Sequence, residues 1–171
     1  MPAKCMGIGG VSQAGKSALA GRLATACSDR TVTVLALDDF CLPESELPLW
    51  TDNEGREFPD WEHPSSVDVS RLTPAIDAAM KLSDLVIAEG ILLFHHREIN
   101  KRFDQRILLE VDEATYFDRR RNDLRRGTPS EAYLKHVWDA YWENKKGLDL
   151  EDVYVFRSSN PADEAFEFLV R

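Results

Sequence analysis

The chain has 171 residues, of which 43% are hydrophobic and 9% aromatic, so it is long enough to bury a core, and we expect one compact domain over residues 1–171. Its formal net charge of -9 would repel a polyanion, which disfavours nucleic acid and acidic membrane surfaces as partners. Three widely spaced cysteines without a C-x-x-C pair, and no apolar run near the roughly 18 residues of a membrane span, favour a cytoplasmic protein without a disulfide framework or zinc site.

Short apolar segments alternate along the chain with segments of helical periodicity. The segments that indicate buried strands are 4–8, 31–37, 84–88, 106–111 and 153–156. Helices are predicted from the first glycine-rich loop to about residue 27, and then over 67–82, 113–126, 130–146 and 161–170. This alternation predicts an α/β fold in which a five-stranded parallel sheet lies between two layers of helices.

The first loop carries the motif G-x-x-x-x-G-K-S between a predicted strand and a predicted helix. Its glycines let successive backbone N–H groups face a phosphate, Lys16 would reach the β- and γ-phosphates, and Ser17 would ligate Mg2+. We therefore predict a P-loop NTPase three-layer sandwich with ATP and Mg2+ as cofactors, although such folds serve switches, pumps and transferases alike. The residues expected to bind the nucleotide are Gly10, Val11, Ser12, Gln13, Ala14, Gly15, Lys16, Ser17 and Ala18.

Two acids follow predicted strands, Asp38 after the second and Glu89 after the third. Ligands of an open parallel sheet bind outside the carboxyl ends of its strands, so both acids should lie near the P-loop. We predict three catalytic residues: Asp38 as the base that orients and deprotonates an acceptor hydroxyl, Lys16, and Glu89. Ser17 and Glu89 are the predicted ligands of the metal ion. The alternative is that each acid caps a helix or is solvated.

The stretch from about residue 38 to 66 fits neither a strand nor a helix pattern. It holds four prolines, one glycine and many acids. Long irregular insertions in compact domains tend to be functional, so we expect this segment to cover the substrate.

A second functional segment, at about residues 119–132, is rich in arginine within an otherwise acidic chain. We expect a helical lid there, whose arginines close over phosphates and exclude water. On one helix at most two or three of them can face the site together. We predict that Arg121 and Arg125 contact phosphate and that Arg120 contacts the substrate. The full run is Arg119, Arg120, Arg121, Arg125 and Arg126.

The predicted helix 130–146 carries aromatic residues at three- and four-residue spacing, namely Trp138, Tyr141 and Trp142. This spacing favours a stripe that packs against the core. On the residues alone, His136 in the same helix is more typical of a packing histidine than of a base.

Several motifs act together as a signature: "LDDFCLPESEL", "DWEHPSSVD", "VIAEGILLF", the "RRR" run and "HVWDAYWENKK". In combination they resemble the uridine kinase and nicotinamide riboside kinase group of P-loop nucleoside kinases, and most closely the nicotinamide riboside kinases. The likeness covers nearly the whole chain. It implies an ATP- and magnesium-dependent transfer of the γ-phosphoryl group to the 5′-hydroxyl of a ribonucleoside, with nicotinamide riboside favoured, as in NAD salvage. Uridine or cytidine is the alternative acceptor.

The resemblance also implies roles for individual residues. Asp38 corresponds to the proposed base of the family and Glu89 to its acid near the metal. Trp61 takes the place of the aromatic that stacks on the substrate base, and Glu62 that of the acid that binds the ribose hydroxyls. His136 lies along the acceptor site, where we expect it to bind the substrate. A flat aromatic beside a carboxylate suits a nucleoside, and a pyridinium ring would gain cation–π attraction. The alternative for Trp61 is a packed loop aromatic.

Two other functions stay open at this point. A kinase of another small hydroxylated metabolite would leave Trp61 without a stacking role. A nucleotide-driven switch would need no nucleoside-binding residues, so Asp38, Trp61 and Glu62 argue against it. The expected partner is thus a small-molecule nucleoside, and the chain is expected to act as a monomer or a homodimer.

Overall fold

A computed structural model describes residues 3–125 and 127–171 of the chain. Its centre is a sheet of five parallel strands in the order β2-β5-β1-β6-β7. The strands are β1 (Lys4–Gly10), β2 (Val32–Ala36), β5 (Leu85–Glu89), β6 (Gln105–Glu110) and β7 (Val153–Arg157). All five predicted strands are therefore confirmed, each with bounds within about two residues of the prediction.

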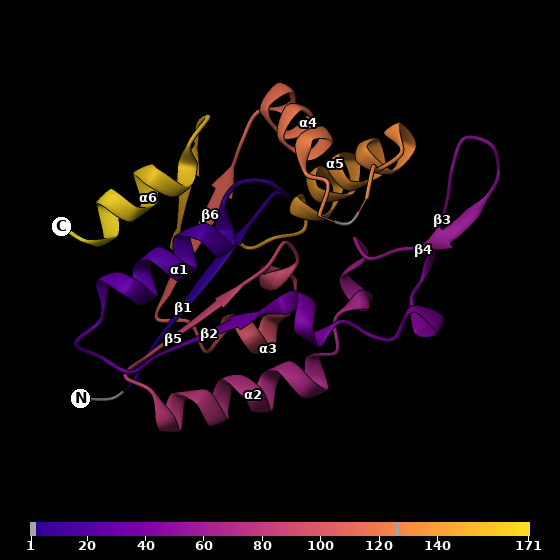
Figure 1. Cartoon of the computed structure of the whole chain (residues 1–171). Helices are drawn as coiled ribbons and strands as arrows, with labels where there is room; N and C mark the ends of the chain where they lie inside the picture. Colours follow the sequence, from indigo (N-terminus) through magenta and orange to yellow (C-terminus); the bar gives the residue numbers. More distant parts are fainter. Residues whose placement is uncertain (1–2, 126) are drawn as a thin grey trace.

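Helices cover both faces of this sheet (Figure 1). On one face α1 (Lys16–Ala26) packs beside α6 (Pro161–Leu169), and on the other α2 (Val69–Leu82) packs beside the short α3 (Arg97–Asn100). The central strands are buried on both sides, which explains why they consist of unbroken apolar runs. None of the helices in the described part of the chain is long and apolar enough to cross a membrane.

The remaining helices, α4 (Glu113–Asn122) and α5 (Glu131–Lys145), lie beyond the carboxyl ends of the strands (Figure 1). Asp112 caps α4 by accepting from the Thr115 N–H at 2.8 Å, as its position before the helix leads one to expect. The predicted helix 113–126 was too long, because α4 ends at Asn122. Its last predicted residue, Arg126, lies outside the described residues.

The segment from residue 38 to 66 is more regular than its sequence indicates. It contains a two-stranded antiparallel hairpin of β3 (Leu49–Thr51) and β4 (Glu57–Pro59), which projects away from the main sheet (Figure 1). Trp50 lies opposite Phe58, and their rings stack with centroids 5.3 Å apart. Strands of three residues flanked by prolines are too short to show an alternating pattern, which is why the sequence did not reveal them.

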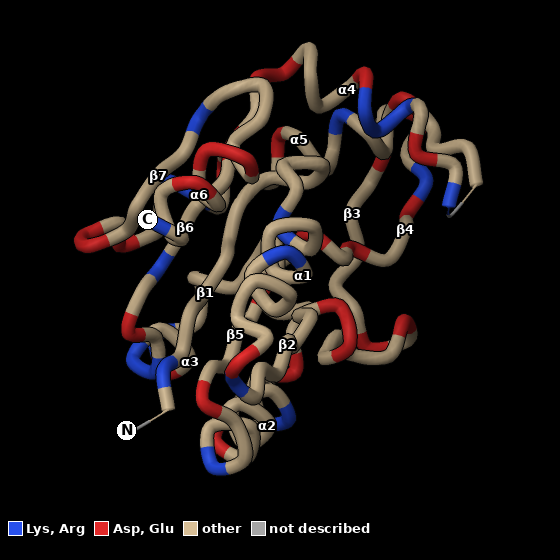
Figure 2. The backbone as a smooth tube through the Cα atoms, turned by 60° about the vertical axis from the view of Figure 1, so that its left-hand side comes forward, with Lys and Arg blue, Asp and Glu red and all other residues tan. Residues whose placement is uncertain are grey.

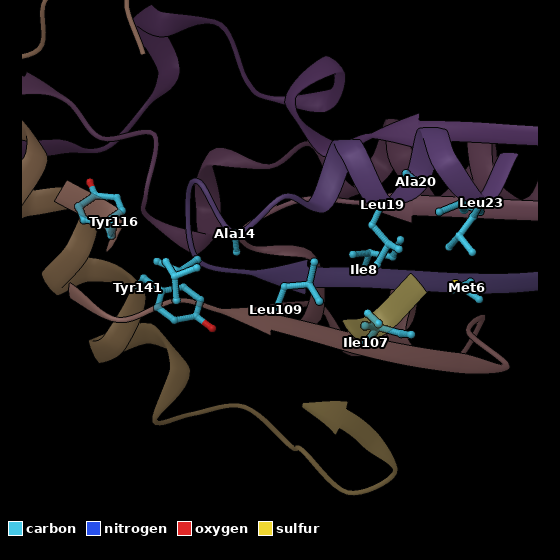
Figure 3. Close-up of a cluster of buried hydrophobic side chains, with 14 of the residues drawn as sticks. Met6, Ile8, Ala14, Leu19, Ala20, Leu23, Ile107, Leu109, Tyr116 and Tyr141 are labelled. Carbon is cyan, nitrogen blue, oxygen red and sulfur yellow. The ribbon is translucent and has the colours of Figure 1, made fainter. Parts of the chain in front are cut away.

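The core on the α1 and α6 face extends past the end of β6 into the lid helices. Figure 3 shows Ile8, Leu19 and Ile107 in the middle of this cluster, with Tyr116 of α4 and Tyr141 of α5 at one end, near Ala14 of the P-loop. The Tyr116 hydroxyl donates to the Leu134 carbonyl at 2.9 Å and so joins α4 to α5. Packing thus fixes both helices next to the first loop. The other residues of the cluster drawn in Figure 3 and labelled there are Met6, Ala20, Leu23 and Leu109.

Candidate active site

The turn between β1 and α1 has the curled backbone that an anion site needs. Gly10 has φ +137°, Gln13 +66° and Gly15 +89°. The Val11 N–H donates to the Leu109 carbonyl at 3.1 Å, and the Ala14 N–H donates back to the Val11 carbonyl at 3.3 Å. Left-handed residues within such a loop turn successive N–H groups toward one side, and α1 adds its positive end. The geometry agrees with the predicted phosphate cradle.

Gly10 allows β1 to approach β6 at the start of this loop. A Cβ atom at residue 10 would lie 2.0 Å from the Leu109 carbonyl oxygen, on a backbone that also has positive φ. We expect Gly10→Ala to lower the free energy of unfolding by roughly 2–4 kcal/mol, measured by urea denaturation. Gly21→Ala is the matched control, because Gly21 lies within α1 with no atom in the way, and alanine should leave stability equal or slightly higher. Equal stability of Gly10→Ala and wild type would contradict this account.

Lys16 is buried at the first position of α1, and its Nζ donates to the Val11 carbonyl at 2.8 Å. Burial lowers the pKa of this ammonium group below its usual value. The carboxylates that act in the opposite direction are those of Glu89, Asp38 and Glu62. Three predicted site acids from three separate segments therefore lie within electrostatic range of one lysine.

The two predicted metal ligands, Ser17 and Glu89, are in direct contact. The Ser17 hydroxyl donates to Glu89 Oε1 at 2.7 Å, and Glu89 is buried at the end of β5. A hydroxyl and a carboxylate are oxygen donors of the kind that Mg2+ prefers, so these residues fit the predicted ion. Asp38 lies in the 3-10 turn η1 (Leu37–Phe40) directly after β2, and it is exposed, which leaves its carboxylate accessible to an acceptor.

Trp61 and Glu62 differ sharply in burial. The Trp61 side chain is exposed at 39%, which speaks against the packed loop aromatic that was the alternative for it. Glu62 is only 7% exposed, and burial raises the pKa of its carboxyl to about 7, while His136 and Lys16 act to lower it. The site thus contains a carboxyl group that titrates near neutral pH.

His136 projects from α5 onto the 38–66 segment. Its Nε2 is 2.8 Å from Asp60 Oδ1, and its ring stacks on that of Trp50 at a centroid distance of 4.2 Å. Sequence reasoning missed Asp60 and Trp50, since both belong to this irregular segment. The only available signal was that Asp60 precedes Trp61 and Glu62 in the "DWEHP" motif.

The arginine that reaches the P-loop is one that the prediction did not select. Basic residues concentrate along α4 (Figure 2), and from there Arg119 donates to the Gln13 carbonyl at 3.0 Å. The same guanidinium donates to the Ser159 carbonyl and, at 3.1 Å, to Asn160 Oδ1. Arg119 therefore connects the P-loop to the loop after β7. Arg119 differs from the adjacent arginines only in its position around α4, which directs its side chain to the P-loop.

The structure places the predicted lid arginines differently. Arg121 makes two hydrogen bonds to Glu131, at 2.9 and 2.8 Å, and both side chains are exposed, so the structure pairs Arg121 with α5 and not with the P-loop. Arg125 pairs with Asp123 at 2.7 Å, and Asp123 also accepts from the Gln13 side chain at 2.8 Å. Arg120 donates to the Asp123 carbonyl at 3.4 Å. Asp123 also explains the early end of α4, because its carboxylate binds the P-loop and Arg125.

Known proteins resemble this chain in sequence at low identity. No family model matches the chain. Its sequence is 25% identical over 169 residues to nicotinamide riboside kinase 2 of Mus musculus, covering 88% of this chain and 84% of that protein. This chain is a P-loop kinase similar to the nicotinamide riboside and uridine kinases.

Solved structures support the fold of this kinase. A possible uridine kinase from Bacillus stearothermophilus superposes with a TM-score of 0.54 at 19% identity, covering 90% of this chain and 89% of that one. A gluconokinase from Sinorhizobium meliloti superposes with a TM-score of 0.52 at 16% identity, covering 97% and 88%. At these identities the likeness concerns the fold alone. The predicted α/β P-loop fold is therefore confirmed. The likeness in sequence to a nicotinamide riboside kinase supports a phosphotransferase with an alcohol acceptor.

Proposed function

We propose that this kinase transfers the γ-phosphoryl group of ATP to the 5′-hydroxyl of a ribonucleoside, with nicotinamide riboside as the preferred acceptor. The observation that carries the proposal is the buried Glu62 carboxyl within electrostatic range of both Lys16 and Asp38, next in sequence to the exposed Trp61. A carboxylate can accept from both hydroxyls of a ribose diol while an aromatic ring stacks on the base. The likeness to a nicotinamide riboside kinase supports the same acceptor.

Each residue then has a defined task. Asp38 orients the acceptor hydroxyl and takes its proton, and the P-loop N–H groups with Lys16 bind the donor phosphates. Ser17 and Glu89 would hold Mg2+, which supplies charge neutralisation at the phosphates when bound. Arg119, from its place between Gln13 and Asn160, can close the phosphate site against water.

Charge favours a cationic acceptor. The acceptor side of the site carries the carboxyl groups of Asp38 and Glu62, both of which act on Lys16. A pyridinium nucleoside gains attraction to these carboxyl groups and cation–π attraction to the face of Trp61, whereas neutral uridine can stack on the ring but gains neither of these charge effects. Uridine or cytidine is the second candidate acceptor, because the sequence motifs also resemble those of the uridine kinases.

The proposal is tested by ADP release with ATP and Mg2+ against nicotinamide riboside, nicotinic acid riboside, uridine, cytidine, adenosine, pantothenate and no acceptor. We expect the highest kcat/KM with nicotinamide riboside. Faster turnover of uridine or cytidine would show that a pyrimidine nucleoside is the preferred acceptor. Turnover of pantothenate alone, or the same ADP release without any acceptor, would refute a nucleoside kinase.

Removing the Trp61 ring should weaken acceptor binding only. We expect Trp61→Ala to weaken acceptor binding by roughly 1–3 kcal/mol, because the stacking contact with the base is lost. This loss should be seen as a higher KM for the acceptor. The KM for ATP should stay as in wild type. Tyr154→Ala is the control, since Tyr154 is a similarly exposed aromatic on β7. An unchanged acceptor KM in Trp61→Ala would show that the ring does not stack on the base.

Acceptor use should depend on the ionisation of Glu62. Because burial raises the pKa of this carboxyl to about 7, it is protonated below that pH and becomes a full acceptor for the ribose hydroxyls above it. We expect kcat/KM for the acceptor to rise as the pH passes upward through about 7. In Glu62→Gln this rise should be absent. A flat wild-type profile, or the same rise in Glu62→Gln, would contradict the assignment.

A further inference from the structure

His136 is engaged by protein groups on two sides. Its Nε2 lies 2.8 Å from Asp60 Oδ1, and its ring lies nearly parallel to that of Trp50, at 5° with centroids 4.2 Å apart. The side chains of His136 and Asp60 are both largely buried. One ring face and one ring nitrogen of His136 are therefore already used by the 38–66 segment.

The partner of His136 in turn holds the backbone of Glu62. Asp60 Oδ1, the atom next to His136, accepts from the Glu62 N–H at 3.0 Å. Eight residues after His136 on α5, the Asn144 side chain donates to the Glu62 carbonyl at 2.8 Å. Helix α5 thus holds both backbone polar groups of Glu62. It holds the N–H through Asp60, which His136 contacts, and the carbonyl directly through Asn144.

We propose that His136 is a positioning residue, which acts through Asp60 to hold Glu62 where it meets the acceptor, and does not contact the acceptor itself. This inference rests on the proposed function, because Glu62 is there assigned to the ribose. It replaces the expectation that His136 binds the substrate. A carboxylate that must meet two hydroxyls needs its supporting contacts fixed, since a displacement of about 1 Å at a site already weakens binding.

Electrostatics adds to the mechanical effect. Burial raises the pKa of Asp60, but the hydrogen bond and the charge of His136, together with the Glu62 N–H and the charge of His63, bring this pKa below its usual value. After burial, His136 is also the largest influence on Glu62, whose pKa it lowers. Asp60, Lys16 and Asp38 also act on Glu62, and Glu62 in turn raises the pKa of Tyr116. Loss of His136 would therefore both release the Glu62 backbone and favour the protonated carboxyl.

The test compares His136→Ala, His136→Gln and Asp60→Ala. We expect His136→Ala and Asp60→Ala each to raise the acceptor KM by about tenfold to a hundredfold, since each removes a hydrogen bond to a charged group, with the KM for ATP unchanged. His136→Gln should recover much of the loss, because a glutamine amide can donate to Asp60. The double variant should lose little more than either single one, as expected for residues that act through one contact.

The control is Lys135→Ala on the same helix, where Lys135 is exposed and pairs with Asp139. It should match wild type in every rate constant. A direct contact between His136 and the acceptor predicts additive losses and no recovery in His136→Gln, which would overturn the proposal. A purely structural role predicts equal losses in acceptor KM, ATP KM and melting temperature, and would overturn it as well.

A second measurement needs no acceptor. The Glu62 carboxyl can be followed by 13C NMR in the free kinase, with Glu62→Gln to assign its signal. We expect the Glu62 titration to move to higher pH in His136→Ala and in His136→Gln, and to stay in place in Lys135→Ala. An unmoved titration in both His136 variants would refute the coupling. If no ribonucleoside is phosphorylated, the proposed function fails, while this measurement still decides whether His136 acts on Glu62.

Discussion

Replacing Lys16 by methionine is expected to reduce kcat by about 10²- to 10³-fold, the usual effect of removing one preorganised charged donor from a transition state. Methionine fills a similar volume but leaves the carboxylates of Glu62 and Glu89 buried in a site without its central cation. Binding of ATP should weaken too, because the ammonium group is the predicted contact to the β- and γ-phosphates. Steady-state kinetics and ATP titration measure both effects.

Lys4→Met is the control for this substitution, since Lys4 is an exposed lysine at the start of β1. It should leave kcat and ATP affinity as in wild type. If Lys16→Met kept more than about a tenth of the wild-type kcat, the P-loop lysine would not serve the transferred phosphate.

Replacing Asp38 by asparagine is expected to lower kcat by about 10²- to 10⁴-fold while ATP still binds with wild-type affinity. Asparagine has nearly the same shape but cannot take the acceptor proton. The separation of turnover from nucleotide binding is what distinguishes a base from a structural acid. ADP release and equilibrium ATP binding, measured on the same preparation, test this.

Asp39→Asn is the matched control, because Asp39 is the neighbouring exposed acid on the same 3-10 turn. We expect it to stay within about threefold of wild type, as for most surface substitutions. Equal losses in both variants would indicate that the turn as a whole, and not the Asp38 carboxylate, is needed.

The parts of the fold that the sequence predicts are those with a local cause. The strands are apolar runs, and the P-loop is a contiguous motif whose glycines have a geometric reason, as the 2.0 Å distance from a Cβ at Gly10 to the Leu109 oxygen illustrates. Asp38 and Glu89 were predictable because parallel strands bring their carboxyl ends to one edge. These residues do lie within electrostatic range of Lys16.

The parts that sequence reasoning missed depend on contacts between distant residues. Arg119 binds the carbonyl of Gln13, 106 residues away, and nothing in the "RRR" run marks the first arginine as the one that faces inward. His136 meets Asp60 across 76 residues, and only the folded hairpin supplies Trp50 to its ring. The early end of α4 has the same origin, since the carboxylate of Asp123 binds Gln13.

If this kinase phosphorylates ribonucleosides as proposed, phosphate is placed on their 5′-oxygen, and 31P NMR of the product identifies the oxygen that carries it. The kinase is incubated with ATP, Mg2+ and nicotinamide riboside, and in parallel with the 5′-deoxy analogue. We expect a phosphomonoester signal coupled to the two C5′ protons, and none with the analogue. A phosphoester on another oxygen, or consumption of ATP without any phosphorylated nucleoside, would contradict it.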